Sequence, residues 1–265
     1  MSFVRYEQSA GVVTLTMSSP QTRNALSADA VEALVSACRR IDEDTHVKAV
    51  VLAAEGPAFS AGGDLKAMHE SIERGLPSEQ EIAEGFVEGI HRMTRAVHGL
   101  AVPIVAAIDG PAIGAGLDLA CMCDVRIASR NASFAESFVK LGLVPGDGGA
   151  WFLTRLLGRQ HAAALALTGD LIDAPTALAL GLVARVVEPE ALLLEAQALA
   201  GRMALHSGIA VRLTKRLLRA SETQDLDSVL KQSAASQALA IRSPEHRQAV
   251  ASLIERMSKT ARAAT

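Results

Sequence analysis

Two glycine-rich turns could hold a negative charge with main-chain N–H groups. The first, Gly62-Gly63-Asp64, follows an apolar run at 48–54 and precedes a helical pattern. The second, Gly114-Ala115-Gly116, follows another apolar run at 103–108. Glycine lets the backbone approach a ligand closely, and the N–H groups of a strand-to-helix turn can point at it. If the two turns converge, they form an oxyanion hole for a carbonyl oxygen that gains charge.

Carboxylates stand close to these turns in the sequence. Asp118 comes two residues after Gly116, and Asp147 lies in a third glycine-rich turn at 144–149. A carboxyl group in such an apolar turn has a raised pKa and can move a proton. Asp147 could instead cap the helix that follows, and Asp64 is expected to cap its own helix. Glu136 is a further candidate, which we expect to face solvent.

The elements that must position these residues alternate along the chain. Residues 3–8 and 12–17 predict a hairpin, and the runs at 47–53 and 103–108 predict buried strands. Ser27 is expected to cap a helix, and Ser78 with Glu81 predicts a capping box that opens a helix to about 98. Alternating strands and helices favour an α/β fold with parallel strands.

After about residue 188 the pattern becomes entirely helical. Four segments with apolar residues at helical spacing are expected at about 190–204, 209–220, 226–241 and 244–257. We therefore expect two regions, an α/β core at 1–188 that holds the site and a C-terminal helical region at 189–265. The apolar stretch at 234–241 is suited to a subunit interface.

Composition excludes several classes of protein. The 265 residues are 49% apolar and 21% charged, with a net charge of −3 and 3% aromatics, so we expect no nucleic-acid partner. The stretch at 101–123 contains prolines, aspartates and glycines and does not predict a membrane span. We find no signal-peptide pattern and no metal or nucleotide motif. Cys38, Cys121 and Cys123 are expected to be buried free thiols, which favours the cytoplasm.

Four segments together resemble the crotonase superfamily, also called the enoyl-CoA hydratase/isomerase family. They are the segment from Thr22 to Ser27, the segment from Ala58 to Leu65, the segment from Ile108 to Gly116, and the segment from Phe134 to Gly149. The resemblance implies an α/β crotonase-like spiral of ββα turns, with a C-terminal helical trimerisation region. It also implies an acyl-CoA thioester substrate, no separate cofactor, and a homotrimer or a dimer of trimers.

The resemblance also assigns site residues. The N–H groups of Gly63 and Ala115 would hold the thioester oxygen, and Arg23 would bind a phosphate of coenzyme A. Asp118 stands where hydratases of the family carry their first glutamate, and Asp147 is the candidate for the second acid/base group. The residues expected to line the coenzyme A site are Arg23, Ala25, Ala61, Gly62, Gly63, Asp64, Leu65 and Gly114.

One departure from the hydratase pattern leaves the function open. Phe138 stands where the second glutamate would fall, and it cannot transfer a proton. We therefore expect either hydration or double-bond isomerisation of an unsaturated acyl-CoA. The alternative is a catalytically impaired homologue that binds acyl-CoA. A serine peptidase is a third hypothesis, disfavoured because no Gly-x-Ser-x-Gly elbow is present and because His91 and His98 are expected to face solvent.

Overall fold

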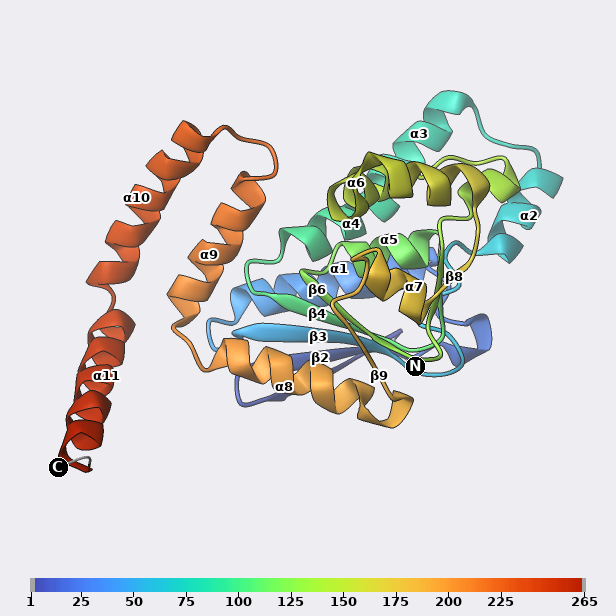
Figure 1. Cartoon of the computed structure of the whole chain (residues 1–265). Helices are drawn as coiled ribbons and strands as arrows, with labels where there is room; N and C mark the ends of the chain where they lie inside the picture. Colours follow the sequence, from blue (N-terminus) through green and yellow to red (C-terminus); the bar gives the residue numbers. More distant parts are fainter. Residues whose placement is uncertain (1–2, 264–265) are drawn as a thin grey trace.

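The protein is built on two sheets of different size. The computed structural model describes residues 3–263, and Figure 1 shows a sheet with helices on both sides and a helical tail that extends away from it. The large sheet has the order β1-β2-β3-β4-β6-β9, and the small sheet has the order β5-β7-β8. The large-sheet strands are β1 (Val4–Ser9), β2 (Val12–Met17), β3 (Ala49–Ala54), β4 (Ile104–Ile108), β6 (Val125–Ser129) and β9 (Arg185–Val187).

The large sheet is parallel except at its first pair. β1 and β2 form the predicted antiparallel hairpin, whereas β2, β3, β4, β6 and β9 run parallel to their neighbours. Parallel strands need helices on both faces, so their sequences are continuously apolar. β3 and β4 fit this rule because every residue from Ala49 to Ala53 and from Ile104 to Ile108 is buried. The predicted α/β class is confirmed.

The small sheet brings the glycine-rich turns together. Its strands are β5 (Pro111–Ile113), β7 (Ser133–Ala135) and β8 (Ile172–Asp173), with β5 and β7 parallel. Two isolated bridges extend it, one from Ser60 to Ala112 and one from Leu26 to Gly63. Because β4 leads to β5 and β6 leads to β7, successive turns of the chain each contribute a strand to both sheets.

Helices cover the two faces of the large sheet separately. α8 (Leu192–Ala204) packs on one face, where Ala196 and Ala200 are fully buried against residues of β3, β4 and β6. The opposite face lies under the other helices of the core (Figure 1). These are α1 (Ala28–Glu43), α4 (Ile90–Gly99), α5 (Ala115–Cys121) and α6 (Gly149–Thr168). Ser27 caps α1 as expected, since its hydroxyl accepts from the Ala30 N–H.

The helix predicted at 78–98 is two helices. Ser78 and Glu81 form the expected capping box at the start of α3 (Glu79–Glu88), but Gly89 leaves helical geometry with φ −103° and ψ −111°. The break redirects α4 onto α1, where Arg92 pairs with Glu32 at 2.9 Å. α2 (Leu65–Glu73) and α3 contain no buried residue. α6 is also interrupted, at Gly158, where φ is +71° and ψ is 164°.

The C-terminal region is helical, as the sequence predicts. After the short α7 (Ala174–Ala179), which the sequence pattern did not reveal, and α8, the chain forms α9 (Gly208–Ala220), α10 (Leu226–Arg242) and α11 (Pro244–Ala263). α9 is tied to the core by Lys215, whose ammonium donates to Asp124 at 2.5 Å and to the Val102 carbonyl at 2.7 Å. α10 and α11 continue away from the body (Figure 1).

Candidate active site

The two glycine-rich turns lie side by side at the small sheet. The Ser60 N–H donates to the Pro111 carbonyl at 3.1 Å, and the Ile113 N–H donates to the Ser60 carbonyl at 3.0 Å. A Cβ on Gly62 would lie 2.4 Å from the Ile113 oxygen and 3.4 Å from the Ala115 nitrogen. Gly62 has φ +87°, so both its backbone conformation and the space around it require glycine.

Two main-chain N–H groups at this junction are unoccupied. The Gly62 N–H donates to the Ser60 hydroxyl at 3.2 Å, and the Gly114 N–H donates to the Ala135 carbonyl at 2.8 Å. Among the described residues, the N–H groups of Gly63 and Ala115 have no acceptor outside their own elements. Both are therefore free for a ligand, in the pattern that an oxyanion hole requires.

The residues expected at the coenzyme A site border the same turns. The Arg23 carbonyl accepts from the Ala61 N–H at 2.9 Å, and the Leu26 N–H donates to the Gly62 carbonyl at 2.8 Å. These bonds place the segment that contains Ala25 beside 60–63. The Arg23 side chain is exposed and makes no ion pair with another described residue. Leu65 is 58% exposed.

Asp64 has a structural role in this turn. Its carboxylate accepts from the N–H groups of Lys66 and Ala67, both at 3.0 Å, and so caps α2. This confirms the capping interpretation. The backbone of Asp64 still lies in the turn, next to Gly63.

Two carboxyl groups share one cradle at Gly149. Asp118 on α5 and Glu136 after β7 are both 0% exposed. The point that a Cβ on Gly149 would occupy is 2.3 Å from Asp118 Oδ1 and 2.2 Å from Glu136 Oε1. The two side chains are therefore adjacent. The expectation that Glu136 faces solvent is wrong, because the two-residue period of β7 carries it to the same side as the buried Phe134.

These buried carboxyl groups have strongly raised pKa values. None of the four oxygens of Asp118 and Glu136 has a well-aligned hydrogen-bond partner among the described residues. Burial first, and then the charges of Glu136 and Asp147, raise the pKa of Asp118 well above its usual value. The Gly149 N–H faces Asp118 and opposes this rise only in part. Burial, followed by the charge of Asp147, raises the pKa of Glu136 to about 8.

Asp147 belongs to the same cluster. It is 4% exposed, and burial raises its pKa to about 6 while nearby His91 opposes the shift. The interpretation of Asp147 as a helix cap is wrong, because Gly148 occupies the cap position of α6 and no side chain caps it. α4 holds the turn in place, since Thr94 donates to the Asp147 carbonyl at 2.9 Å and His91 Nε2 lies 2.8 Å from the Gly146 carbonyl oxygen.

Phe138 and Met68 line the approach to the free N–H groups. The Phe138 ring lies 3.6 Å from the point that a Cβ on Gly114 would occupy. The Met68 methyl group is 2.5 Å from the corresponding point on Gly63. An aromatic ring thus lies beside the second glycine-rich turn. The ionisable groups of the site are the carboxyl groups of Asp118, Glu136 and Asp147.

The two histidines do not form a peptidase site. His91 contacts the turn described above, and the His98 ring packs edge-on against Trp151 and Phe152, with centroids 5.3 Å apart in both pairs. Both side chains are half-buried, so the expectation that they face solvent is wrong. Neither is hydrogen-bonded to a serine in the described part of the chain, which removes the nucleophile–base pair that a serine peptidase needs.

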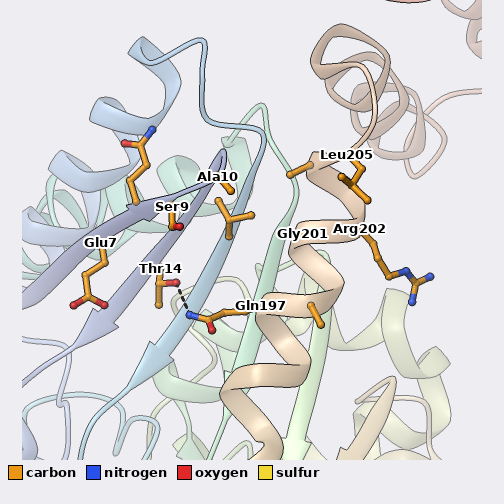
Figure 2. Close-up of a pocket in the computed structure, with 12 residues that line it drawn as sticks. Glu7, Ser9, Ala10, Thr14, Gln197, Gly201, Arg202 and Leu205 are labelled. Carbon is orange, nitrogen blue, oxygen red and sulfur yellow. Dashed lines mark hydrogen bonds between the residues drawn. The ribbon is translucent and has the colours of Figure 1, made fainter. Parts of the chain in front are cut away.

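A large groove opens away from these residues. It has a volume of about 690 Å³ and lies between the β1–β2 hairpin and α8. Figure 2 shows Gln197 of α8 reaching Thr14 of β2, while the Arg202 side chain points away from the strands. This groove is on the α8 face of the large sheet, opposite the carboxyl cluster. It contains no group of converging ionisable side chains.

Residues 3–263 contain neither a candidate membrane span nor a metal-binding cluster. No helix within this range is both long and apolar enough to cross a bilayer. Within the same range, no set of three or more histidine, cysteine or acidic side chains is arranged to hold a metal ion. Cys38, Cys121 and Cys123 are buried and free, as expected.

Comparisons with known proteins agree with this geometry. Residues 7–260 match the model of the enoyl-CoA hydratase/isomerase family. The chain is 32% identical to the 1,2-epoxyphenylacetyl-CoA isomerase of Escherichia coli, with 97% of each chain covered. It is 35% identical to the short-chain-enoyl-CoA hydratase of Clostridium acetobutylicum, with 84% of each covered. The crystal structure of an enoyl-CoA hydratase from Mycobacterium smegmatis superposes with a TM-score of 0.88 at 35% identity, covering 96% of each chain. The chain therefore belongs to the enoyl-CoA hydratase/isomerase family and has the crotonase fold.

Proposed function

We propose that this enzyme forms a thioester enolate from an unsaturated acyl-CoA and then either adds water across the double bond or moves the bond. The observation that supports this most directly is the pairing of two unoccupied N–H groups, at Gly63 and Ala115, with a buried cluster of carboxyl groups. An enolate needs both, because its oxygen must be stabilised while a carbon gains or loses a proton.

In this proposal the thioester oxygen binds between the N–H groups of Gly63 and Ala115. Each such donor stabilises the transition state by about 3 kcal/mol, because the donors are fixed before the charge develops. The exposed Arg23 side chain binds a phosphate of coenzyme A, and the remaining wall of that site comes from Ala25, Ala61, Gly62, Asp64, Leu65 and Gly114. Coenzyme A enters as part of the substrate.

Asp147 and Asp118 have different roles in this scheme. Asp147, with a pKa of about 6, is ionised at neutral pH and acts as the base. Asp118, whose pKa is raised well above its usual range, keeps its proton and acts as the acid. In hydration, Asp147 takes a proton from water as oxygen attacks the β-carbon, and Asp118 gives a proton to the α-carbon. In isomerisation, Asp147 removes the α-proton and Asp118 protonates the γ-carbon.

Substitution of each acid by its amide tests these roles. We expect Asp118→Asn and Asp147→Asn each to lower kcat by about 10²–10⁴-fold, because general acid–base catalysis contributes that much. The measurement is turnover of crotonyl-CoA and of a 3-enoyl-CoA. Asp170→Asn, at an exposed position, is the matched control and should retain full activity. Undiminished turnover in both site variants would contradict the assignment.

A second candidate function rests on Phe138. Because this ring replaces a carboxylate of the hydratase pattern, the chain could bind acyl-CoA without turnover. Calorimetry with crotonyl-CoA, run beside an assay on a panel of unsaturated acyl-CoA thioesters, separates the two candidates. Binding without turnover on any member of the panel would support the second candidate. The three buried carboxyl groups, which a binding protein would not need, favour the enzyme.

The expected assembly and location complete the proposal. We propose that the enzyme works as a homotrimer or a dimer of trimers, because α10 and α11 extend from the core with apolar side chains exposed. We also propose a cytoplasmic location, because the three buried thiols remain free.

A further inference from the structure

We propose that Glu136 sets the protonation state of Asp118, with the two carboxyl groups holding one proton between them in the resting enzyme. Glu136 is then a positioning residue that keeps Asp118 as a carboxylic acid. The inference deepens the proposed function, on which its catalytic consequence rests. The proton sharing itself concerns the enzyme without substrate.

Two adjacent buried charges at this site would be costly. Asp118 and Glu136 are both 0% exposed, and both reach the same point beside Gly149. Neither forms an ion pair with a cation of the described chain. Two like charges this close and buried from solvent cannot both persist, and binding one proton removes one of them.

The two carboxyl groups also lack other hydrogen-bond partners among the described residues. All four carboxyl oxygens are buried without a well-aligned donor among the described residues. Buried polar atoms are nearly always paired, so an unpaired set needs an explanation. A proton on Asp118 supplies it, because the acid O–H can donate to Glu136 and give both groups a partner. Burial is the largest cause of the raised pKa at both groups, and the hydrogen bond between them acts in addition, raising the pKa of Asp118 and lowering that of Glu136.

The groups that face Asp118 and Glu136 from neighbouring elements do not supply a positive charge in place of that proton. Asp147 adds a further negative charge from the turn before α6, and His91 of α4 acts on Asp147. Cys121 of α5 is a buried thiol whose pKa is raised, so it stays neutral. Arg126 of β6, the cation that acts on Cys121, donates to the carbonyls of Leu182 at 2.6 Å and Cys123 at 2.7 Å.

The shared proton has a defined place in the reaction. At the start, the pair holds one proton and Asp147 is ionised. When Asp118 gives its proton to a substrate carbon, Asp147 has taken one from water or from the α-carbon, so the number of protons in the cluster is unchanged. The pair then carries two charges, and this drives return of a proton from Asp147 to the pair. Glu136 thus keeps Asp118 protonated before the reaction and favours the return of a proton to it afterwards.

Infrared spectroscopy of the substrate-free protein tests the inference without any assay. At pH 7 the wild type should show the C=O stretch of a protonated carboxylic acid, shifted in D₂O. Glu136→Gln should lower the pH at which this band disappears, because the substitution removes the neighbouring charge and the glutamine amide donates to Asp118. Asp118→Asn should lower that pH too, since Glu136 then has an amide donor. Glu43→Gln, an exposed position on α1, should leave it unchanged. Absence of the band in the wild type, or an unshifted pH of disappearance in Glu136→Gln, would overturn the proposal.

The pH profile of turnover gives the second readout. Because Asp118 must be protonated, kcat/KM of the wild type should fall at alkaline pH, where Asp118 loses the proton that its raised pKa lets it keep at neutral pH. In Glu136→Gln this alkaline limb should move to lower pH by about one unit or more, whereas a merely structural loss would lower the rate without moving the limb. An unmoved limb would overturn the role of Glu136 in turnover. Failure of all variants and the wild type to turn over substrate would count against the proposed function, while the infrared result would still decide the proton sharing.

Discussion

At the scale of single residues, the carboxyl cluster depends on the absence of a side chain at Gly149. A side chain there would occupy the space in which Asp118 and Glu136 meet, since its Cβ would lie within 2.3 Å of both.

The cluster also stores electrostatic free energy, because Glu136 and Asp147 have pKa values of about 8 and about 6 in the folded chain. In the unfolded chain both would lose their protons near pH 4.

This difference predicts a pH dependence of stability. The folded chain binds more protons than the unfolded chain between about pH 4 and pH 8, so the free energy of unfolding should fall as pH rises through that range. The slope reaches about 1.4 kcal/mol per pH unit for each proton. Urea unfolding across this range measures it. Glu136→Gln should flatten the curve, whereas Glu43→Gln should leave the slope unchanged. A flat curve for the wild type would contradict the prediction.

Sequence patterns predict some residues of this site much better than others. The order of the motifs indicates Gly63, Ala115, Asp118 and Asp147, and the fold brings their turns together. The sequence does not indicate that Glu136 is buried, because a three-residue strand such as β7 has too few positions to show a period of two. Its signal was present, since Glu136 follows Phe134 by two residues, but it depended on knowing that β7 exists.

At the scale of elements, the contact between the two glycine-rich turns depends on Gly62. Gly62→Ala should lower the free energy of unfolding by about 1–3 kcal/mol through backbone strain alone, and by more because the added Cβ would lie 2.4 Å from the Ile113 oxygen. Gly181→Ala is the matched control, because Gly181 has φ +80° with nothing within 4 Å of the added Cβ. Chemical denaturation compares them. Equal losses in the two variants would show that the turn contact adds nothing.

Most elements of the core were predictable, and the exceptions share a cause. The long helices and the buried strands β3 and β4 have enough residues to show their period. The helix expected at 78–98 breaks at Gly89, which adopts a non-helical conformation. A single glycine is compatible with a helical pattern, so the sequence does not predict this break. The break depends on the packing of α4 on α1. β8 and α7 were missed because two and six residues give no clear periodicity.

At the scale of the whole molecule, the helical tail is attached at one end and exposed at the other. α9 is anchored through Lys215 and Asp124, and α10 buries only Ser236. α10 and α11 nevertheless expose large apolar residues, including Leu239, Ile241, Leu253 and Ile254. Helices gain most of their stability from packing an apolar face, so we expect this tail to pack on a partner surface.

We predict that the partner is another copy of the chain. The wild type should elute with the mass of three or six chains of 27.7 kDa. The double substitution Leu253→Glu and Ile254→Glu should shift it toward single chains, because each places a charge in an apolar contact. Light scattering after size exclusion measures the mass. Leu167→Glu, an exposed apolar position on α6, should leave it unchanged. A wild type that elutes as one chain would contradict the prediction.

The segment formed by α2 and α3 has a consequence for how this enzyme can diversify. Neither helix buries a residue, and the segment ends at the non-helical Gly89. Substitutions between Leu65 and Glu88 therefore cost little core stability. The same segment contacts the site, because Met68 lies beside Gly63 and the Phe86 ring lies beside Gly146 and His91. Exchange of this one segment should thus change the surroundings of the Gly63 N–H group and of the Asp147 turn at little cost to the folded core.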